Sequence, residues 1–418
     1  MKIFKFGGAS VKDAAGVRNV IRVLKTVEFT DLVIVVSAMG KTTNAMEVIV
    51  ENYLQHPDSL EESLVKIFDF HTKIIKELFG DNDTDVKDKI QALFLDLRTT
   101  LERNKSKQYD YCYDQIVGYG ELFSTVILSE YLMFVGVANQ WLDARNVIKT
   151  DNGYRRAKVD WDWTEENIRK EVVSEGGIYV TQGFIGSDIN NFSTTLGREG
   201  SDYTAGIFAY CLHAENVTIW KDVPGVLNGD PRVFEGTELL QEISYEEAIE
   251  LAFYGASVIH PKTLQPLQRK EIPLYVKSFL HPANPGTSVK KGQALVPYMP
   301  CYIVKKDQIL LSLSSLDFSF IVEKNISEIF ELFDRYKLKV DLIQNSAISF
   351  SVCVEDKFNL FDTVADKLKL KFAVNFEKNV SLYTIRHFTK EAVQKIEGDK
   401  DVLLKQSTRE TFQMIVKQ

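Results

Sequence analysis

The hydrophobic pattern of the first 285 residues alternates between two kinds of segment. Short apolar runs typical of buried strands occur at KIFKF (2–6), DLVIVVSA (31–38), GGIYVTQGF (176–184) and ENVTIW (215–220). Longer stretches with helical spacing lie between them, for example Asn44–Tyr53 and Tyr119–Phe134. This alternation predicts a parallel sheet that is covered by helices.

The pattern changes near residue 285. The stretch PANPGTSVKKGQALVPYMP (282–300) is rich in Pro, Gly and Lys and has no clear periodicity, so residues 286–300 are predicted to be a linker. After residue 300, a strand, helix, strand, strand order appears, and a shorter version of the same unit follows. We therefore expect two small α+β modules in 301–418, of which the second is short. The expected strands are 308–315, 340–343, 348–354, 379–387 and 411–417, and the expected helices are 327–335, 358–368 and 389–398.

Composition and charge exclude several classes of protein. A chain of 418 residues is too long for one ordinary core. The net charge of -8 argues against nucleic acid as a partner, because phosphate binding needs concentrated Lys and Arg. No apolar run is long enough to span a bilayer, and the N-terminus lacks the pattern of a secretory signal. We expect a globular cytoplasmic protein with no membrane partner.

The cysteines and histidines give no sign of a metal site. Cys112, Cys211, Cys301 and Cys353 lie far apart and form no CxxC pair, and the six histidines show no metal-binding spacing. Reduced thiols are expected, and a structural zinc is not.

Candidate chemistry lies where predicted strands give way to helices, since open α/β sheets bind ligands at the carboxyl ends of their strands. The first such junction is KFGGAS (5–10). Gly7 and Gly8 allow backbone N–H groups to approach an anion, and Lys5 adds a positive charge. A Gly-Gly pair after a strand is also typical of a simple tight turn.

The second junction is SAMGKTTN (37–44). Its Gly-Lys-Thr resembles the end of a P-loop, but Val35 stands where that motif requires glycine, so we reject this interpretation. Ser37 and Thr43 carry hydroxyl groups that either hold a small polar ligand or cap the next helix.

The third junction is TTLGREGSDYTA (194–205). Arg198 and Glu199 lie between two glycines, and Ser201 and Asp202 begin a predicted helix. A fork-shaped cation beside a helix N-terminus suits a carboxylate or a phosphate. The alternative is that Asp202 only caps the helix and Arg198 is solvated.

The loop WKDVPGVLNGDPR (220–232) follows another predicted strand and carries Lys221, Asp222 and Arg232. Loops of this composition are usually turns. By itself this loop predicts no site.

The order of these blocks is more specific than any one of them. KFGGAS, VSAMGKTTN, GYGELFST, TQGFIG, TTLGREGSDYTA, WKDVPGVLNGDPR and GASVIHPKTL resemble, in sequence and order, the signature blocks of aspartate kinases in the amino-acid kinase family. The resemblance covers nearly all of residues 1–290. The region after 300 is similar to the paired ACT regulatory modules of those enzymes, most clearly at KLKVDLIQNSAISFSVCV.

The resemblance implies a fold for each part of the chain. Residues 1–285 are expected to form the α/β amino-acid kinase fold, a three-layer αβα sandwich with a mostly parallel sheet. Residues 301–418 are expected to form tandem ferredoxin-like α+β ACT modules that serve regulation or dimerisation.

The implied activity is the ATP-dependent, Mg²⁺-dependent phosphorylation of the β-carboxylate of L-aspartate to 4-phospho-L-aspartate. This is the first step towards lysine, threonine, methionine and diaminopimelate. A homodimer with an amino-acid effector at the ACT region is implied as well. No GxGxxG unit follows residue 300, so we expect a monofunctional kinase.

The resemblance also assigns site residues by position. Lys5 is matched to stabilisation of the γ-phosphoryl group in flight, and Asp202 to an acidic residue linked to catalysis. Arg198 is matched to the α-carboxylate of aspartate and Glu121 to its α-ammonium. The full substrate-binding set is Ser37, Thr43, Glu121, Arg198 and Ser201, and the full ATP-binding set is Lys5, Phe6, Gly7, Gly8, Lys221, Asp222 and Arg232. Ligands of Mg²⁺ are not assigned.

Three positions depart from the family pattern. Glu199 stands where many members have glycine, and its carboxylate either orients Arg198 or repels incoming anions. Leu227 replaces a frequent tyrosine and Ser257 a nucleotide-binding lysine, which puts ATP contacts at both positions in question. Lys262 or Lys277 is a hypothetical replacement for the missing lysine.

The ACT-like region departs from its family as well. Typical ACT ligand sites use a glycine-bearing turn, whereas SSLDFSFI has Phe318 and Phe320 near that point, although Ser346 keeps a familiar polar position. This favours dimerisation with weak or altered feedback.

Two other functions stay open from sequence alone. One is a different kinase of the same fold, acting on glutamate or on a nucleoside monophosphate. The other is a catalytically silent amino-acid sensor, which the changes at Glu199, Leu227 and Ser257 would favour.

Overall fold

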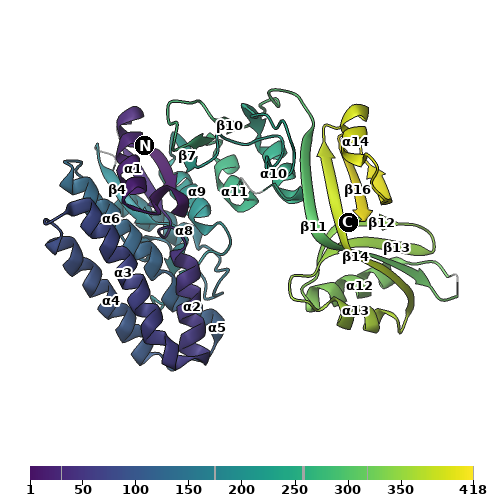
Figure 1. Ribbon diagram of the computed structural model, residues 1–418, viewed down its shortest axis with the longest axis horizontal. Helices are drawn as coiled ribbons and strands as arrows, with labels where there is room; N and C mark the ends of the chain where they lie inside the picture. The colour runs from purple at the N-terminus through teal and green to yellow at the C-terminus, as the bar shows by residue number, and fades with distance from the viewer. Residues whose placement is uncertain (30, 174–175, 257–258, 318, 418) are drawn as a thin grey trace. The chain divides into compact units, whose positions relative to one another are not determined.

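The computed structural model describes the whole chain except Thr30, Ser174, Glu175, Ser257, Val258, Phe318 and Gln418 (Figure 1). The chain forms two compact units. The first contains Met1–Val226, Leu239–Ile249 and Val258–Val296, and the second contains Leu227–Glu238, Glu250–Ser257 and Pro297–Gln418. Two short segments between residues 227 and 257 thus belong to the second unit, although the chain around them belongs to the first.

An eight-stranded sheet forms the centre of the first unit, in the order β3-β4-β2-β1-β7-β9-β10-β8. Its strands are β1 (Lys2–Phe6), β2 (Leu32–Val36), β3 (Gln140–Leu142), β4 (Ile178–Gln182), β7 (Asn216–Lys221), β8 (Glu242–Ser244), β9 (Leu274–Ser278) and β10 (Thr287–Lys290). Every pairing is parallel except that between β9 and β10. A separate two-stranded hairpin consists of β5 (Ile185–Ser187) and β6 (Ser193–Thr195). The predicted mostly parallel sheet is confirmed.

Strand β10 lies inside the segment that the sequence pattern predicts to be a linker. Thr287 and Val289 are buried, whereas Ser288 and Lys290 are partly exposed, so the strand does alternate. Four residues are too few for this period to be visible in the sequence. The prediction of a linker is therefore wrong for 287–290.

The helices of the first unit cover both faces of its sheet. They are α1 (Ala14–Thr26), α2 (Thr42–Gln55), α3 (Leu60–Phe79), α4 (Thr84–Arg103), α5 (Tyr109–Val117), α6 (Tyr119–Phe134), α7 (Ala144–Val147), α8 (Trp161–Glu171), α9 (Gly200–Leu212) and α11 (Pro261–Arg269), with short 3₁₀ turns η1 (Gly8–Val11) and η2 (Pro57–Ser59). Helix α10 (Tyr245–Tyr254) begins in the first unit, and its residues from Glu250 on belong to the second. Gln182 of β4 donates to Thr125 of α6 at 2.6 Å. Lys5 points to the opposite face and meets Asp202 of α9. This arrangement confirms the predicted three-layer sandwich, and Figure 1 shows α3, α4 and α6 packed side by side.

The second unit has a six-stranded antiparallel sheet in the order β12-β13-β11-β14-β16-β15. Its strands are β11 (Cys301–Ser315), β12 (Lys339–Asn345), β13 (Ser349–Glu355), β14 (Phe372–Arg386), β15 (Val402–Ser407) and β16 (Thr411–Lys417), and its helices are α12 (Glu323–Arg335), α13 (Phe361–Leu368) and α14 (Lys390–Glu397). The strands and helices expected after residue 300 are present, although β11 and β14 begin earlier than predicted and β15 was not predicted. The early start of β11 has a visible cause. The register shifts between Lys305 and Leu310 interrupt its period.

Two long strands, β11 and β14, run through both halves of this sheet. The later part of β11 and the early part of β14 pack with α12 and α13 around one core. The first residues of β11, Cys301–Lys305, pair instead with the end of β14, which in turn pairs with β16 near α14. The first module is therefore inserted into the second.

Phe333 of α12 tests the core of the first module, because its side chain is 1% exposed. We expect Phe333→Ala to lower the free energy of unfolding of this unit by about 3–5 kcal/mol, since the ring leaves a cavity. Leu370→Ala is the matched control, because Leu370 is 81% exposed. Denaturation in guanidinium, followed by circular dichroism, measures both. Equal losses in the two variants would contradict the assignment of this core.

Candidate active site

The carboxyl ends of four parallel strands meet at one edge of the large sheet. Phe6 of β1 lies in register with Val36 of β2 and Trp220 of β7, and Val36 lies in register with Gln182 of β4. The loops that leave these strands therefore begin at the same height. Ligands bind at this edge in open α/β sheets.

The first two predicted junctions are joined by backbone hydrogen bonds. The amide of Ser37 donates to the carbonyl of Phe6 (3.1 Å), and the amide of Gly40 donates to the carbonyl of Gly8 (3.0 Å). A Cβ atom on Gly8 would lie 2.7 Å from the carbonyl oxygen of Ala38. Only glycine permits this close approach, so both loops form one continuous surface.

A cluster of charges lies beside these loops. Nζ of Lys5 is 2.6 Å from Oδ1 of Asp202, and Nζ of Lys221 is 3.5 Å from Oδ2 of the same carboxylate. The side chain of Asp202 is only 2% exposed and belongs to the first turn of α9. Burial alone would raise the pKa of Asp202, but the two ammonium groups outweigh it and lower the pKa.

The Lys5–Asp202–Lys221 cluster has one more positive than negative charge. The N-terminus of α9 adds further partial positive charge at the same point. An anion with several oxygens, such as a phosphoryl group, is the ligand that this arrangement suits.

Glu121 is a buried carboxylate that suits a ligand with a positive charge. Its side chain, on α6, is buried, and Oε1 accepts a long hydrogen bond of 3.3 Å from the amide of Ala38. Within the part of the chain that the structure describes, Oε2 of Glu121 has no hydrogen-bond partner. Burial raises the pKa of Glu121 from 4.5 to about 8. A ligand cation such as an ammonium group would provide the missing partner.

The third junction, which includes the first turn of α9, lies against the loop that follows β4. A Cβ atom on Gly183, just after β4, would lie 2.4 Å from Cβ of Ser201, so the loop after β4 touches the first turn of α9. Gly197 has a φ of +82°, and the exposed Arg198 follows it. The structure thus brings Arg198, Ser201 and Asp202 to the same edge as Lys5.

Glu199 occupies a strained position between Arg198 and α9. Its φ of +53° lies in the left-handed region, which favours glycine, and this strain is typically found at functional sites. Burial and the nearby charge of Asp202 raise the pKa of Glu199, while Lys221 opposes the shift. The carboxylate of Glu199 is therefore close enough to interact electrostatically with the Lys5–Asp202–Lys221 cluster.

The other predicted side chains differ in exposure. Ser37 and Thr43 are half-buried, and Ser201 is buried. The Phe6 ring is fully buried and stacks on Trp220, with centroids 6.2 Å apart. Phe6 can therefore contact a ligand at this edge only through its backbone.

Not all of the predicted nucleotide loop lies in the first unit. Asp222 follows β7 there and is exposed. Arg232 and Leu227 belong to the second unit, where the guanidinium of Arg232 forms a two-pronged pair with Asp230 (2.7 and 3.0 Å). Ser257 lies outside the described residues.

The two lysines considered as replacements for the missing lysine occupy different places. Nζ of Lys262 lies 3.5 Å from the carbonyl oxygen of Leu196, just before the loop of Arg198. Lys277 is in register with Trp220 and so faces the side of the sheet opposite to Lys5. Of the two, Lys262 lies nearer to the predicted site residues.

Sequence reasoning missed the residues that support the site. Gly183 was visible in the motif TQGFIG, but only the structure shows its contact with Ser201. Ser124 donates to the carbonyl of Ser37 at 2.8 Å, and Gly120 leaves room for Ala38 and Thr42. Their signal was the small-residue pattern of GYGELFST.

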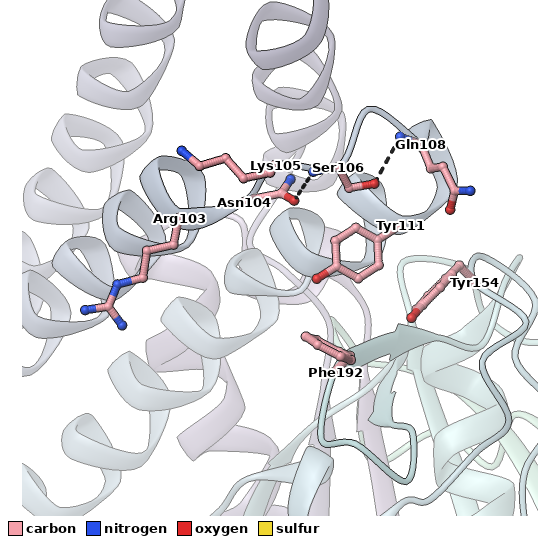
Figure 2. A pocket seen from close by; sticks show the side chains of 8 residues that line it. All are labelled: Arg103, Asn104, Lys105, Ser106, Gln108, Tyr111, Tyr154 and Phe192. Atoms are coloured by element: carbon pink, nitrogen blue, oxygen red, sulfur yellow. Dashed lines mark hydrogen bonds between the residues drawn. The ribbon is translucent and has the colours of Figure 1, made fainter.

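A cavity of about 460 Å³ lies elsewhere in the structure (Figure 2). It is open to solvent at the loop between α4 and α5 and is lined by Arg103, Asn104, Lys105, Ser106, Gln108, Tyr111, Tyr154 and Phe192. None of the predicted site residues lines it, so the candidate site rests on charge and loop geometry instead.

The described residues contain no group of three or more His, Cys, Asp or Glu side chains placed to bind a metal ion. No helix among them has both the length and the apolar character needed to cross a membrane.

The fold and the site define a class of protein. The sequence profile of the amino acid kinase family matches residues 1–278, and the chain belongs to that family. The predicted family is confirmed.

Named relatives and a solved structure show which members of the family this chain is similar to. Lysine-sensitive aspartokinase 3 of Escherichia coli is 33% identical over 84% of this chain and 78% of its own length. A bifunctional aspartokinase/homoserine dehydrogenase of Arabidopsis thaliana is 32% identical over 69% of this chain, which spans only 32% of that relative. The crystal structure of E. coli aspartokinase III with aspartate and ADP superposes with a TM-score of 0.83 at 28% identity, covering 100% of this chain and 96% of that one. Within the family, the chain groups with the aspartokinases.

Glu121 makes the stability of the free protein depend on pH. Between pH 4.5 and about 8, the unfolded chain has lost this proton while the folded protein keeps it. The contribution of Glu121 to the free energy of unfolding therefore falls as pH rises through this window. Gln imitates the protonated acid, so we expect Glu121→Gln to raise the Tm at pH 8 by about 2 °C or more, with little change at pH 5.

The matched control is Glu51→Gln, because Glu51 is exposed on α2. Differential scanning calorimetry at both pH values measures the variants. A Glu121→Gln protein that gains no stability at pH 8 relative to pH 5 would contradict the raised pKa.

Proposed function

We propose that the protein is an aspartate kinase, which transfers the γ-phosphoryl group of ATP to the β-carboxylate of L-aspartate and forms 4-phospho-L-aspartate. The observation that carries this proposal is the Lys5–Asp202–Lys221 cluster at the strand ends, together with the buried Glu121, whose Oε2 has no hydrogen-bond partner among the described residues. The E. coli relative whose structure contains aspartate and ADP supports it. The product would enter amino-acid biosynthesis towards lysine, threonine, methionine and diaminopimelate.

Aspartate is bound at both of its ends in this proposal. Glu121 pairs with the α-ammonium group, and the fork of Arg198 accepts the α-carboxylate in a bidentate pair. Ser37, Thr43 and Ser201 provide hydroxyl groups in the adjoining loops. A nucleoside monophosphate has no ammonium group for Glu121, which favours an amino acid as the acceptor.

The reaction needs alignment and neutralisation of charge. The β-carboxylate is already a nucleophile, so no covalent enzyme intermediate is required. Lys5 neutralises charge on the γ-phosphoryl group during transfer, and Asp202 holds the Lys5 ammonium in place. The backbone around Phe6, Gly7 and Gly8 faces the phosphates.

The rest of the nucleotide is assigned to the loop after β7. Lys221 and Asp222, which both belong to the first unit, are the proposed contacts. Magnesium bound with the nucleotide would neutralise phosphate charge. Two lysines already surround Asp202, so phosphates and water are the expected ligands of the ion.

Hydroxylamine trapping tests the reaction, because an acyl phosphate gives a coloured hydroxamate and a phosphate ester does not. We expect hydroxamate from the purified protein with Mg-ATP and L-aspartate. Lys5→Ala and Asp202→Ala should each lower kcat by about 10²–10³, since each removes charge stabilisation from the transition state. Lys2→Ala is the matched control on the same strand and should retain activity. ATP binding without hydroxamate would instead indicate an amino-acid sensor.

The second unit is proposed to mediate homodimer formation and to bind an amino-acid effector. A crystal structure of the E. coli relative contains lysine as well as aspartate, which supports an effector of this kind. Phe320 is exposed, and Oγ of Ser346 hydrogen-bonds to Oγ of Ser349 at 2.6 Å, whereas Phe318 lies outside the described residues. Ser346 keeps the familiar polar position, and the departures at Phe318 and Phe320 are what favour weak feedback.

Light scattering and inhibition assays test this proposal. We expect a dimer in solution and at most partial inhibition by millimolar lysine or threonine. Complete inhibition by either amino acid would overturn the weak-feedback part, and a monomer would overturn the dimer.

A further inference from the structure

Asp114, on α5, is a buried carboxylate that the proposed reaction does not use. Its side chain is 0% exposed, and both of its oxygens accept hydrogen bonds. Oδ2 accepts from the amides of Arg155 (2.9 Å) and Thr195 (2.8 Å), and Oδ1 accepts from Oγ1 of Thr195 (2.8 Å) and the amide of Arg155 (3.1 Å). One side chain thus fixes two separate backbone segments.

Both segments lie close to the loop that carries Arg198. Thr195 ends β6, three residues before Arg198. The loop of Arg155 lies alongside, because the amide of Ala157 donates to the carbonyl of Thr195 (3.1 Å). A Cβ atom on Gly197 would lie 3.1 Å from the carbonyl oxygen of Arg155. The position of the Arg198 loop therefore depends on how Asp114 holds these neighbours.

Arg155 is itself held tightly against α5. Its φ is +65°, a strained value for a residue with a side chain. Its guanidinium lies over the rings of Tyr113 and Tyr109, 4.6 and 5.3 Å from their centroids. The hydrogen bonds to Asp114 and these ring contacts together maintain the strained backbone.

Helix α5 is also connected to the other substrate loop. The hydroxyl of Tyr113 donates to Glu47 of α2 at 3.0 Å. Helix α2 begins at Thr42, so Thr43 lies in its first turn. The loops of Thr43 and Arg198 are thereby positioned relative to one helix.

We propose that Asp114 is a positioning residue for aspartate binding: it sets the height of the Thr195–Arg198 segment so that Arg198 meets the substrate carboxylate in the same frame as Thr43. This inference rests on the proposed function. Asp114 does not touch the substrate and acts only through the backbone of Thr195 and Arg155.

The contacts require a carboxylate at this position. All of the groups around it are donors, and an ionised carboxylate only accepts. Asparagine has the same shape but replaces one acceptor oxygen by an NH₂ group: at the Oδ2 position the NH₂ would face both backbone amides, and at the Oδ1 position it would face the amide of Arg155 and reverse the bond with the Thr195 hydroxyl. Asp114→Asn therefore disturbs the loop without creating a cavity.

Calorimetric titration of L-aspartate and of ADP into the whole protein separates positioning from general stability. We expect Asp114→Asn to raise the Kd for L-aspartate by about 5- to 100-fold, because one of the two buried acceptor oxygens is lost, while the Kd for ADP stays within about twofold. Asp110→Asn is the matched control, because Asp110 lies on the same helix but is exposed and contacts only the Arg155 side chain among these residues (3.4 Å). It should leave both constants unchanged.

A second, milder variant tests the same role in case the Asp114→Asn protein does not fold. Thr195→Val removes only the hydroxyl donor and keeps the backbone amide bond, so it should shift the Kd for L-aspartate in the same direction by a smaller factor. An unchanged Kd for L-aspartate, or equal losses for L-aspartate and ADP, would overturn the positioning role. Because titration needs no turnover, wild-type protein that binds aspartate but forms no hydroxamate would overturn the kinase proposal and leave this test intact.

Discussion

The buried ion pair between Lys5 and Asp202 joins the end of a central strand to the first turn of a helix from far along the chain. The two side chains are 9% and 2% exposed, so water screens their attraction little. Removal of one partner from such a pair leaves a buried charge and typically costs about 3–5 kcal/mol. The pair can form only when β1 lies between β2 and β7 with α9 above it. The strand order at the centre of the sheet is thus a condition for the chemistry as well as for the fold.

The charges around this pair are not balanced in the free protein. Lys5 and Lys221 share Asp202, burial raises the pKa of Glu121, and Glu199 is held in a strained backbone conformation. Each of these arrangements costs stability. A phosphoryl group and an ammonium group would compensate them. The proposed binding site is therefore organised for charges that its ligands would bring.

The sequence predicted the parts of this structure that have a clear hydrophobic period. β1 and β2 are almost wholly buried and appear as continuous apolar runs, and their parallel order places Gly7, Ser37 and Lys221 at one edge. Strand β10 was not predicted, because four residues are too few for its alternation to be recognised in the sequence. The sequence did not predict that Asp114 is a buried hydrogen-bond acceptor, because its partners lie on a distant loop and hairpin. The residue pattern of α5 is also that of an ordinary helix.

The two long strands of the C-terminal sheet impose an order on how this region can fold as the chain is synthesised. All of the inner module, from the later part of β11 to the early part of β14, leaves the ribosome before the end of β14 does. The first residues of β11 emerge earlier still, yet their partner is the last stretch of β14, which in turn pairs with β16 at 411–417. The inner module can therefore close first, while the outer one cannot close until β16 has been synthesised.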